Sequence, residues 1–227
     1  MKWPKFTPEG FKKIKLPKDL YDEIFGYYNA KKICEDGTEA VYERLDADKY
    51  YDAQYGAHVV AGSIEVRFAK PKDTYVKAQF LSQDILDRWA EMIRPHLEEW
   101  CGEKLVFSTG YGIREYIPNS VLSIHRDNKR THVISANIFI DESPDGLGWP
   151  LEFVDHEKNI HKVVFEHGDI LFYESLCPHS RIIPFQGNFY RNMFFHYRPA
   201  DWDHTLYDGK KVKYYCMQEV LDEVIEQ

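Results

Sequence analysis

The sequence predicts a mainly β protein with flanking helices, organised around a double-sheet jelly roll. From Leu105 onward the chain consists of short runs rich in Val, Ile, Phe and Tyr, separated by turn residues such as Pro144-Asp145-Gly146. Runs of this length and composition are typical of the strands in sandwiches and barrels. There are eight such runs, and a jelly roll is built from eight short strands.

The eight expected strands cover residues 105–109, 121–127, 131–140, 151–154, 161–165, 170–173, 180–183 and 189–197. Ahead of them, apolar residues recur at helical spacing between Ser82 and Gly102, which are a suitable helix cap and a suitable helix stop. Residues 20–28 predict an earlier helix of the same kind, and the tail at 217–225 is expected to form a last one. These helices are interpreted as scaffold.

The chain length and composition indicate one globular domain. A chain of 227 residues that is 44% hydrophobic and 15% aromatic can bury a sizeable core without disulfides or a structural metal. We therefore expect residues 1–227 to form a single domain. Within it, residues 1–104 would give helical N-terminal support, residues 105–199 the jelly-roll core, and residues 200–227 a C-terminal extension.

The charge balance argues against some classes of partner. A formal charge of −8 disfavours nucleic acid, and the basic runs at 12–15 and 210–213 are interpreted as solvated edges. No apolar run approaches membrane-spanning length, so no membrane partner is expected. Four widely spaced cysteines indicate reduced thiols and a cytoplasmic protein. The oligomeric state is left open.

The main chemical signal is a histidine and an aspartate two residues apart. His125 and Asp127 fall on an expected strand, where alternate side chains point to the same face. His179 follows after further strands and supplies a second imidazole. Two histidines and one carboxylate can bind one face of an iron ion and leave three positions open for other ligands.

These residues lie within a longer set of blocks. The chain resembles the 2-oxoglutarate/Fe(II)-dependent oxygenases, most nearly their prolyl 4-hydroxylase-like branch, across about residues 111–199. The blocks that carry the resemblance are residues 114–116, 122–127, 130–135, 149–151 and 167–175, followed by His179 with Pro184 and Gly187.

The resemblance implies a double-stranded β-helix, which is a cupin-like jelly roll. It also implies a dioxygenase that uses Fe(II), 2-oxoglutarate and O2, with ascorbate as an optional reductant. Such an enzyme hydroxylates a C–H bond and releases succinate and CO2. The substrate class stays open between peptidyl proline and a small amino-acid-like metabolite. A non-catalytic metal-binding jelly roll or sensor and, less favoured, a nucleic-acid dealkylase are the alternatives.

The resemblance also implies residues that bind the co-substrate. Arg191, on the strand after His179, is expected to anchor the distal carboxylate of 2-oxoglutarate, and Arg181 is the alternative. Tyr116 matches a tyrosine that contacts the co-substrate in the family. Ser135 and Asn137 share one face of a strand and would line the pocket if that face is inward. Other histidines, His196 among them, are expected to lie on the surface or to be structural.

Overall fold

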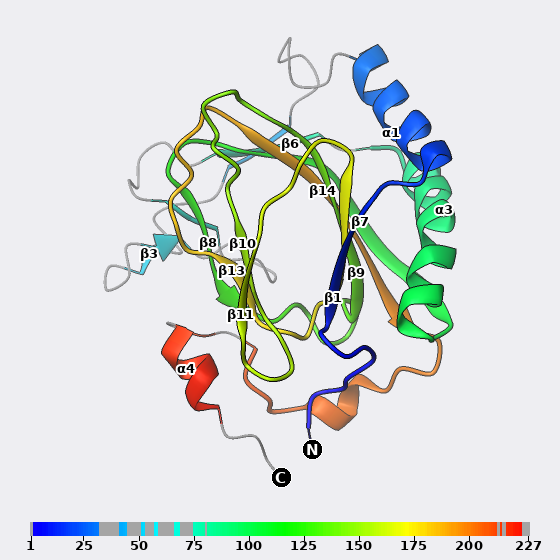
Figure 1. Ribbon diagram of the computed structural model, residues 1–227, viewed down its shortest axis with the longest axis vertical. Coiled ribbons are helices and arrows are strands. Elements are labelled where there is room, and N and C mark those ends of the chain that lie inside the picture. The colour runs from blue at the N-terminus through cyan, green and yellow to red at the C-terminus, as the bar shows by residue number, and fades with distance from the viewer. Residues whose placement is uncertain are drawn as a thin grey trace.

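The computed structural model describes residues 2–31, 81–212, 214 and 217–223, together with the backbone of five short strands between residues 41 and 79. Two β-sheets face each other across the centre of the molecule (Figure 1). In the described part of the chain, every strand pairing within these two sheets is antiparallel. This arrangement is the predicted double-stranded β-helix.

The larger sheet has seven strands in the described residues. Its order is β1 (Phe11–Lys15), β12 (Asp169–Glu174), β9 (Ile134–Glu142), β14 (Tyr190–Pro199), β7 (Leu105–Tyr116), β6 (Tyr75–Gln79) and β2 (Val41–Arg44). The smaller sheet has the order β11 (Ile160–Val163), β10 (Leu151–Val154), β13 (His179–Arg181), β8 (Ser120–His125) and β5 (Val66–Phe68). A separate hairpin pairs β3 (Tyr51–Asp52) with β4 (Ala57–His58).

All eight strands predicted from the sequence are present, as β7 to β14. The N-terminal part of the chain contributes more strand than expected, since β1 and β6 extend the larger sheet and β5 extends the smaller one. The run Phe11–Lys15 pairs with β12 at one edge, where its lysines Lys13 and Lys15 lie 3.1 and 2.7 Å from the carboxylate of Asp169. Lysine on an edge strand discourages pairing with another chain.

The two faces of the larger sheet pack into different cores. On β9, Ile134, Ala136 and Ile138 belong to the outer core beneath the helices, whereas Phe139 belongs to the inner core between the sheets. Strand alternation requires this division, because successive side chains point to opposite faces. The same alternation on β14 decides which of its residues can reach the barrel interior.

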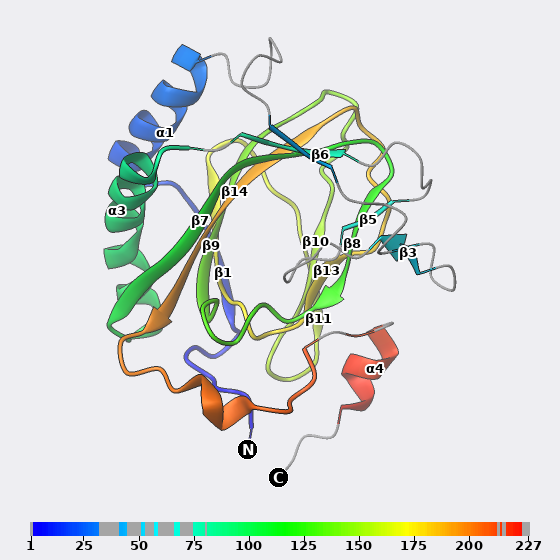
Figure 2. The same ribbon diagram turned by 180° about the vertical axis from the view of Figure 1, so that it is seen from behind.

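Two helices cover the outer face of the larger sheet. Helix α1 (Lys18–Lys31) and helix α3 (Gln83–Cys101) lie side by side against it, as both views show (Figures 1 and 2). Their buried residues, including Trp89 and Ile93, join the outer core. Gly102 ends α3 with a φ of 76°, as predicted, but the side chain of Ser82 makes no capping hydrogen bond.

The C-terminal part lies at one end of the barrel, near the start of the chain. A 3-10 helix, η1 (His204–Tyr207), carries Tyr207, whose ring stacks on Trp3 at 5.4 Å. Helix α4 (Met217–Asp222) follows and is shorter than the predicted range, of which residues 224 and 225 lie outside the described part. Among the described helices, none has the length and apolar character needed to cross a membrane.

Candidate metal centre

The three predicted metal ligands converge on one point in the smaller sheet. His125 ends β8, Asp127 follows two residues later, and His179 begins β13 directly opposite His125 in the strand register. The Nε2 atoms of His125 and His179 lie 3.4 and 3.7 Å from Oδ1 of Asp127. The candidate ligand atoms of all three residues lie within 4.8 Å of one another, and all three side chains are buried.

The protonation of this group suits a divalent cation. The Nδ1 atom of His179 donates to the carbonyl oxygen of Cys177 at 2.9 Å, so its Nε2 carries the free lone pair. Burial, followed by the nearby His125, lowers the pKa of His179 to about 4, so the imidazole is neutral at neutral pH. One imidazole lone pair is therefore ready to bind a metal.

Asp127 supplies the negative charge. Burial alone would raise the pKa of Asp127, but the hydrogen bond from His125 and the neighbouring imidazoles outweigh it and hold the pKa well below its usual range. Its Oδ2 atom is buried and has no hydrogen-bond partner among the described residues. A buried carboxylate oxygen without a partner is costly unless a cation compensates it. The residues present therefore fit a bound Fe(II).

His196, which was expected to be structural or on the surface, is buried beside the carboxylate of Asp127. Nδ1 of His196 lies 3.8 Å from Oδ2 of Asp127 and 2.7 Å from Oγ of Ser135, which also bonds to Ser175. Ser135 thus lies on the inward face of its strand, which is the orientation that would let it line the pocket. Its hydroxyl contacts His196, however, and does not line the pocket. His196 itself does line the pocket, and its alternation with Phe194 on β14 was the signal that could have identified it.

A small cavity opens beside the three ligands. It is lined by Tyr116, Leu122, His125, Asp127, Asn137, Leu151, Tyr173, His179, Arg181, Phe194 and His196. Of the residues predicted to bind the co-substrate, the structure brings Tyr116, Asn137 and Arg181 to this cavity. Asn137 Oδ1 is buried without a hydrogen-bond partner among the described residues, so it is available to a ligand. Tyr173 is a lining residue that the sequence analysis did not identify.

Arg181 is a fully buried cation in the cavity wall. One guanidinium N–H donates to the carbonyl of Trp149 and another donates to the hydroxyl of Tyr190 at 2.8 Å. The guanidinium also lies over the Trp149 and Tyr190 rings at 4.7 and 4.5 Å. No carboxylate among the described residues forms an ion pair with it. Its charge acts on the carboxyl of Glu142, whose pKa is raised by burial and lowered in part by the guanidinium, without a direct ion pair.

Arg191 lies on the other side of the larger sheet. Its Nη2 and Nε atoms are each 2.7 Å from Oε2 of Glu115, and Nη1 is 2.6 Å from the hydroxyl of Tyr28 on α1. The predicted alternation with Met193 on β14 holds, but Met193 belongs to the outer core beneath the helices. The assignment of Arg191 as the co-substrate anchor is therefore corrected, because its charge is already paired outside the cavity.

Solved structures with this fold include several oxygenases. A prolyl-4-hydroxylase from Pseudomonas putida aligns with a TM-score of 0.50 at 15% identity, covering 84% of this chain and 93% of that one. HygX from Streptomyces hygroscopicus, solved with nickel, 2-oxoglutarate and hygromycin B, aligns with a TM-score of 0.52 at 12% identity, covering 93% and 95%. A prolyl hydroxylase from Trichoplax adhaerens, solved with a peptide fragment of hypoxia inducible factor, aligns with a TM-score of 0.52 at 10% identity, covering 88% of each.

No protein-family model matches the chain, and no curated protein matches it. The similarities to solved structures show the fold. The chain has the double-stranded β-helix of 2-oxoglutarate/Fe(II) oxygenases, with a group of two histidines and one carboxylate inside it.

Proposed function

We propose that the chain is an Fe(II)- and 2-oxoglutarate-dependent dioxygenase that hydroxylates a C–H bond of a small-molecule or peptide substrate. The observation that carries the proposal is the buried Arg181, which forms no direct ion pair with a carboxylate counter-ion among the described residues and shares a cavity wall with His125, Asp127 and His179. A dicarboxylate that binds the metal at one end would supply that counter-ion at the other.

The metal would be held by His125, Asp127 and His179, which leave three positions for other ligands. Bound Fe(II), with 2-oxoglutarate and O2, supplies the oxidising chemistry, in which one oxygen atom enters the substrate and the other enters succinate as CO2 is released. The carbonyl of Cys177 keeps the ring of His179 oriented, and His196 and Ser135 lie beside the carboxylate of Asp127.

The distal carboxylate of 2-oxoglutarate would be bound by Arg181. Two features of its surroundings support this role. The hydroxyl of Tyr190 accepts from the guanidinium and keeps it in place, and burial among aromatic rings excludes water, which strengthens an ion pair. Tyr116, whose ring centroid lies 5.3 Å from that of Trp149, and Asn137 would contact the same co-substrate.

Binding requires side chains to move. The cavity measures about 20 Å³, which is close to the space of a single water molecule. Phe194 is the least buried of the strand residues that line it and lies next to the ligands, so it is the side chain most able to turn away. The chain would then exclude solvent around the bound co-substrate and orient the reacting bond.

The substrate class is best sought among peptides and polar small molecules. HygX was solved with hygromycin B and the Trichoplax adhaerens enzyme with a peptide, so the fold accommodates both. A net charge of −8 disfavours nucleic acid as a substrate. The test is succinate release from 2-oxoglutarate, with Fe(II) and ascorbate, across prolyl peptides, free amino acids and aminoglycosides.

One substrate class should raise succinate formation above the background without substrate, with an equal amount of hydroxylated product. The matched control is Asp127→Ala, which lacks a metal ligand and should give no succinate above a protein-free blank. Succinate formation that is equal in the wild type and in Asp127→Ala would rule out the proposed reaction.

A further inference from the structure

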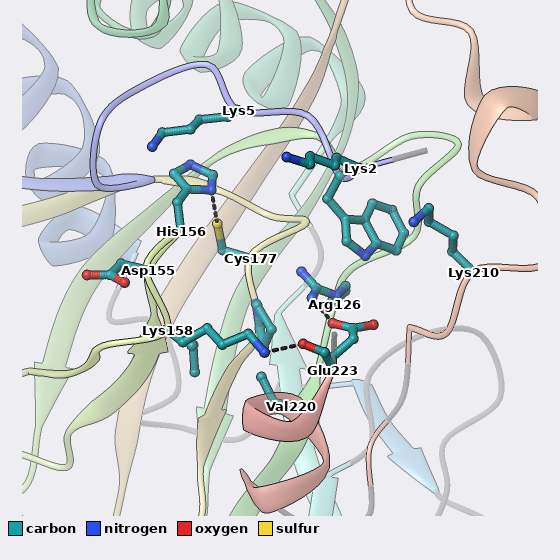
Figure 3. A pocket seen from close by; sticks show the side chains of 13 residues that line it. Lys2, Lys5, Arg126, Asp155, His156, Lys158, Cys177, Lys210, Val220 and Glu223 are labelled. Atoms are coloured by element: carbon teal, nitrogen blue, oxygen red, sulfur yellow. Dashed lines mark hydrogen bonds and ion pairs between the residues drawn. The ribbon is translucent and has the colours of Figure 1, made fainter. Parts of the chain in front are cut away.

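A second, larger cavity lies on the opposite side of the metal-binding strand. It measures about 490 Å³ and is enclosed by the N-terminal segment, the turn after β10, the residues before His179, and α4. Arg126 lines it, while its neighbours His125 and Asp127 line the first cavity, because alternate side chains point to opposite faces. Figure 3 shows this cavity with its basic and acidic side chains.

The charged residues around this cavity are mainly cationic. Among the described residues, five cations line it, namely Lys2, Lys5, Arg126, Lys158 and Lys210, against the two acids Asp155 and Glu223. Such a concentration of positive charge is unusual in a chain whose net charge is −8. A cavity lined by one sign of charge attracts ligands of the other sign.

Both acids are already engaged with the protein. Asp155 accepts hydrogen bonds from the backbone N–H groups of Glu157 and Asn159 and faces His161 at 2.7 Å. Glu223 forms an ion pair with Arg126 at 2.6 Å. Neither carboxylate is therefore available to neutralise the lysines across the cavity.

None of the four lysines has an acidic partner among the described residues, but Lys158 donates to the backbone carbonyls of Leu221 and Glu223, which leaves three. Lys2 and Lys5 come from the N-terminal segment and Lys210 from the segment after η1, and Figure 3 shows them around the same opening as His156 and Cys177. In the described part of the chain, the Lys210 ammonium approaches the aromatic ring of Trp3 at 5.7 Å. Lysine ammonium groups bind phosphates and carboxylates as point charges.

A metal site at this cavity is less consistent with the contacts. His156, Glu174 and Cys177 are close enough to bind one ion. However, Glu174 already accepts from the backbone N–H and the hydroxyl of Thr7, each at 2.7 Å. Burial, followed by Glu174, raises the pKa of Cys177, so its thiol stays protonated, and the surrounding lysines repel a cation.

We propose that this cavity binds an organic anion with two or more negative charges, carried by phosphate or carboxylate groups. Its volume lies within the roughly 300 to 1,000 Å³ of small-molecule pockets and exceeds what an inorganic ion needs. Trp3, Val154, Pro178 and Val220 provide apolar wall for the organic part. The ligand would bind separately from the substrate of the first cavity.

The position of the site would couple it to the metal centre. The guanidinium of Arg126 donates to the carbonyl of Leu176, and the next carbonyl, that of Cys177, accepts from Nδ1 of His179. The Tyr214 hydroxyl accepts from Arg126 at 2.7 Å, which ties the C-terminal segment to the same strand. A ligand that contacts the Arg126 guanidinium would therefore act on the segment whose carbonyl groups bind Arg126 and orient His179.

Calorimetric titration of the full chain with pyrophosphate, and separately with tricarballylate, tests the proposal and distinguishes the two kinds of anionic group. The Lys2→Glu/Lys5→Glu variant should lose at least about tenfold in affinity for each anion that binds, the effect of losing one charged contact. The matched control, Lys12→Glu/Arg130→Glu, has the same change in net charge at exposed positions away from the cavity and should keep wild-type affinity.

Arg181→Gln separates this site from the first cavity and should also bind the anion as the wild type does. Binding of either anion with this pattern supports the proposal. The proposal is overturned if neither anion binds the wild type at about 0.15 M salt. It is also overturned if the control pair loses as much affinity as the Lys2/Lys5 pair, or if Arg181→Gln alone abolishes binding.

Discussion

Arg191 on β14 and Glu115 on β7 form a buried ion pair across two neighbouring strands, with two guanidinium nitrogens each 2.7 Å from the same carboxylate oxygen. Because Arg191→Ala removes both of these contacts to a buried carboxylate, it should lower the free energy of unfolding by about 3 to 5 kcal/mol. Urea denaturation measures this loss. Tyr28→Phe, which removes only the hydroxyl next to Arg191, should cost less.

Because Arg191 is paired with Glu115 outside the cavity, we expect its removal to leave the affinity for 2-oxoglutarate unchanged. The folded fraction of Arg191→Ala should bind 2-oxoglutarate within a few-fold of the wild type. Wild-type stability in that variant, combined with lost 2-oxoglutarate affinity, would restore Arg191 as the anchor.

Asp127→Ala should abolish Fe(II) binding and turnover while the protein stays folded, because the carboxylate contacts neighbouring histidines and contributes no apolar surface to the two hydrophobic cores. Metal content after dialysis and the circular dichroism spectrum measure the two effects separately. Asp155→Ala is a matched control, since Asp155 faces His161 and is not part of the metal centre. Retention of stoichiometric Fe(II) by Asp127→Ala would contradict the ligand assignment.

The metal-free protein should lose stability as the pH falls from 7 to 5. The pKa of His179 is lowered from 6.5 to about 4 in the folded state, mainly by burial, so the unfolded chain takes up the proton first and is favoured at acid pH. This residue alone should lower the free energy of unfolding by about 2 kcal/mol over that range. The contribution of His179 to the free energy of unfolding is fully present above about pH 6.5 and is lost as the pH falls toward 4.

His132 and His196 are shifted in the same direction, also first by burial, so the total loss in the wild type should be larger. The contribution of His179 is the difference from His179→Gln, measured by urea unfolding in the presence of a chelator. Identical pH profiles for the two proteins would show that His179 is not held neutral by the fold.

The strands of the core could be predicted because each is a local pattern. Apolar runs bounded by turns identified β7 to β14, and helical spacing identified α3. The pairing of β1 with β12 could not be predicted in the same way, because it joins Phe11 to Tyr173 across the chain and depends on the finished sheet. A basic run that looks like solvated surface is in fact an edge strand.

The proposed metal ligands could be predicted because His125 and Asp127 share a strand face, and because His179, followed by Pro184 and Gly187, matched the family resemblance. The choice between Arg191 and Arg181 as the proposed co-substrate anchor could not be made in this way. Alternation assigned Arg191 to the same face as Met193, which the structure also shows, but alternation does not say which face of a sheet is inside the barrel. Only the packing of α1 and α3 against that face decides it.

The most direct test of the account is the affinity for 2-oxoglutarate, measured anaerobically by calorimetry with and without Fe(II). Wild type should bind it only when the metal is present, and Arg181→Gln should weaken binding by about 2 to 5 kcal/mol, the loss expected when one partner of a buried charge pair is removed. The affinity of Arg181→Lys for 2-oxoglutarate should lie between those of the wild type and Arg181→Gln. Lysine keeps the positive charge but lacks the planar guanidinium that binds a carboxylate at two points. Metal-independent binding, or an Arg181→Gln protein with wild-type affinity, would contradict the assignment of this cavity to the co-substrate.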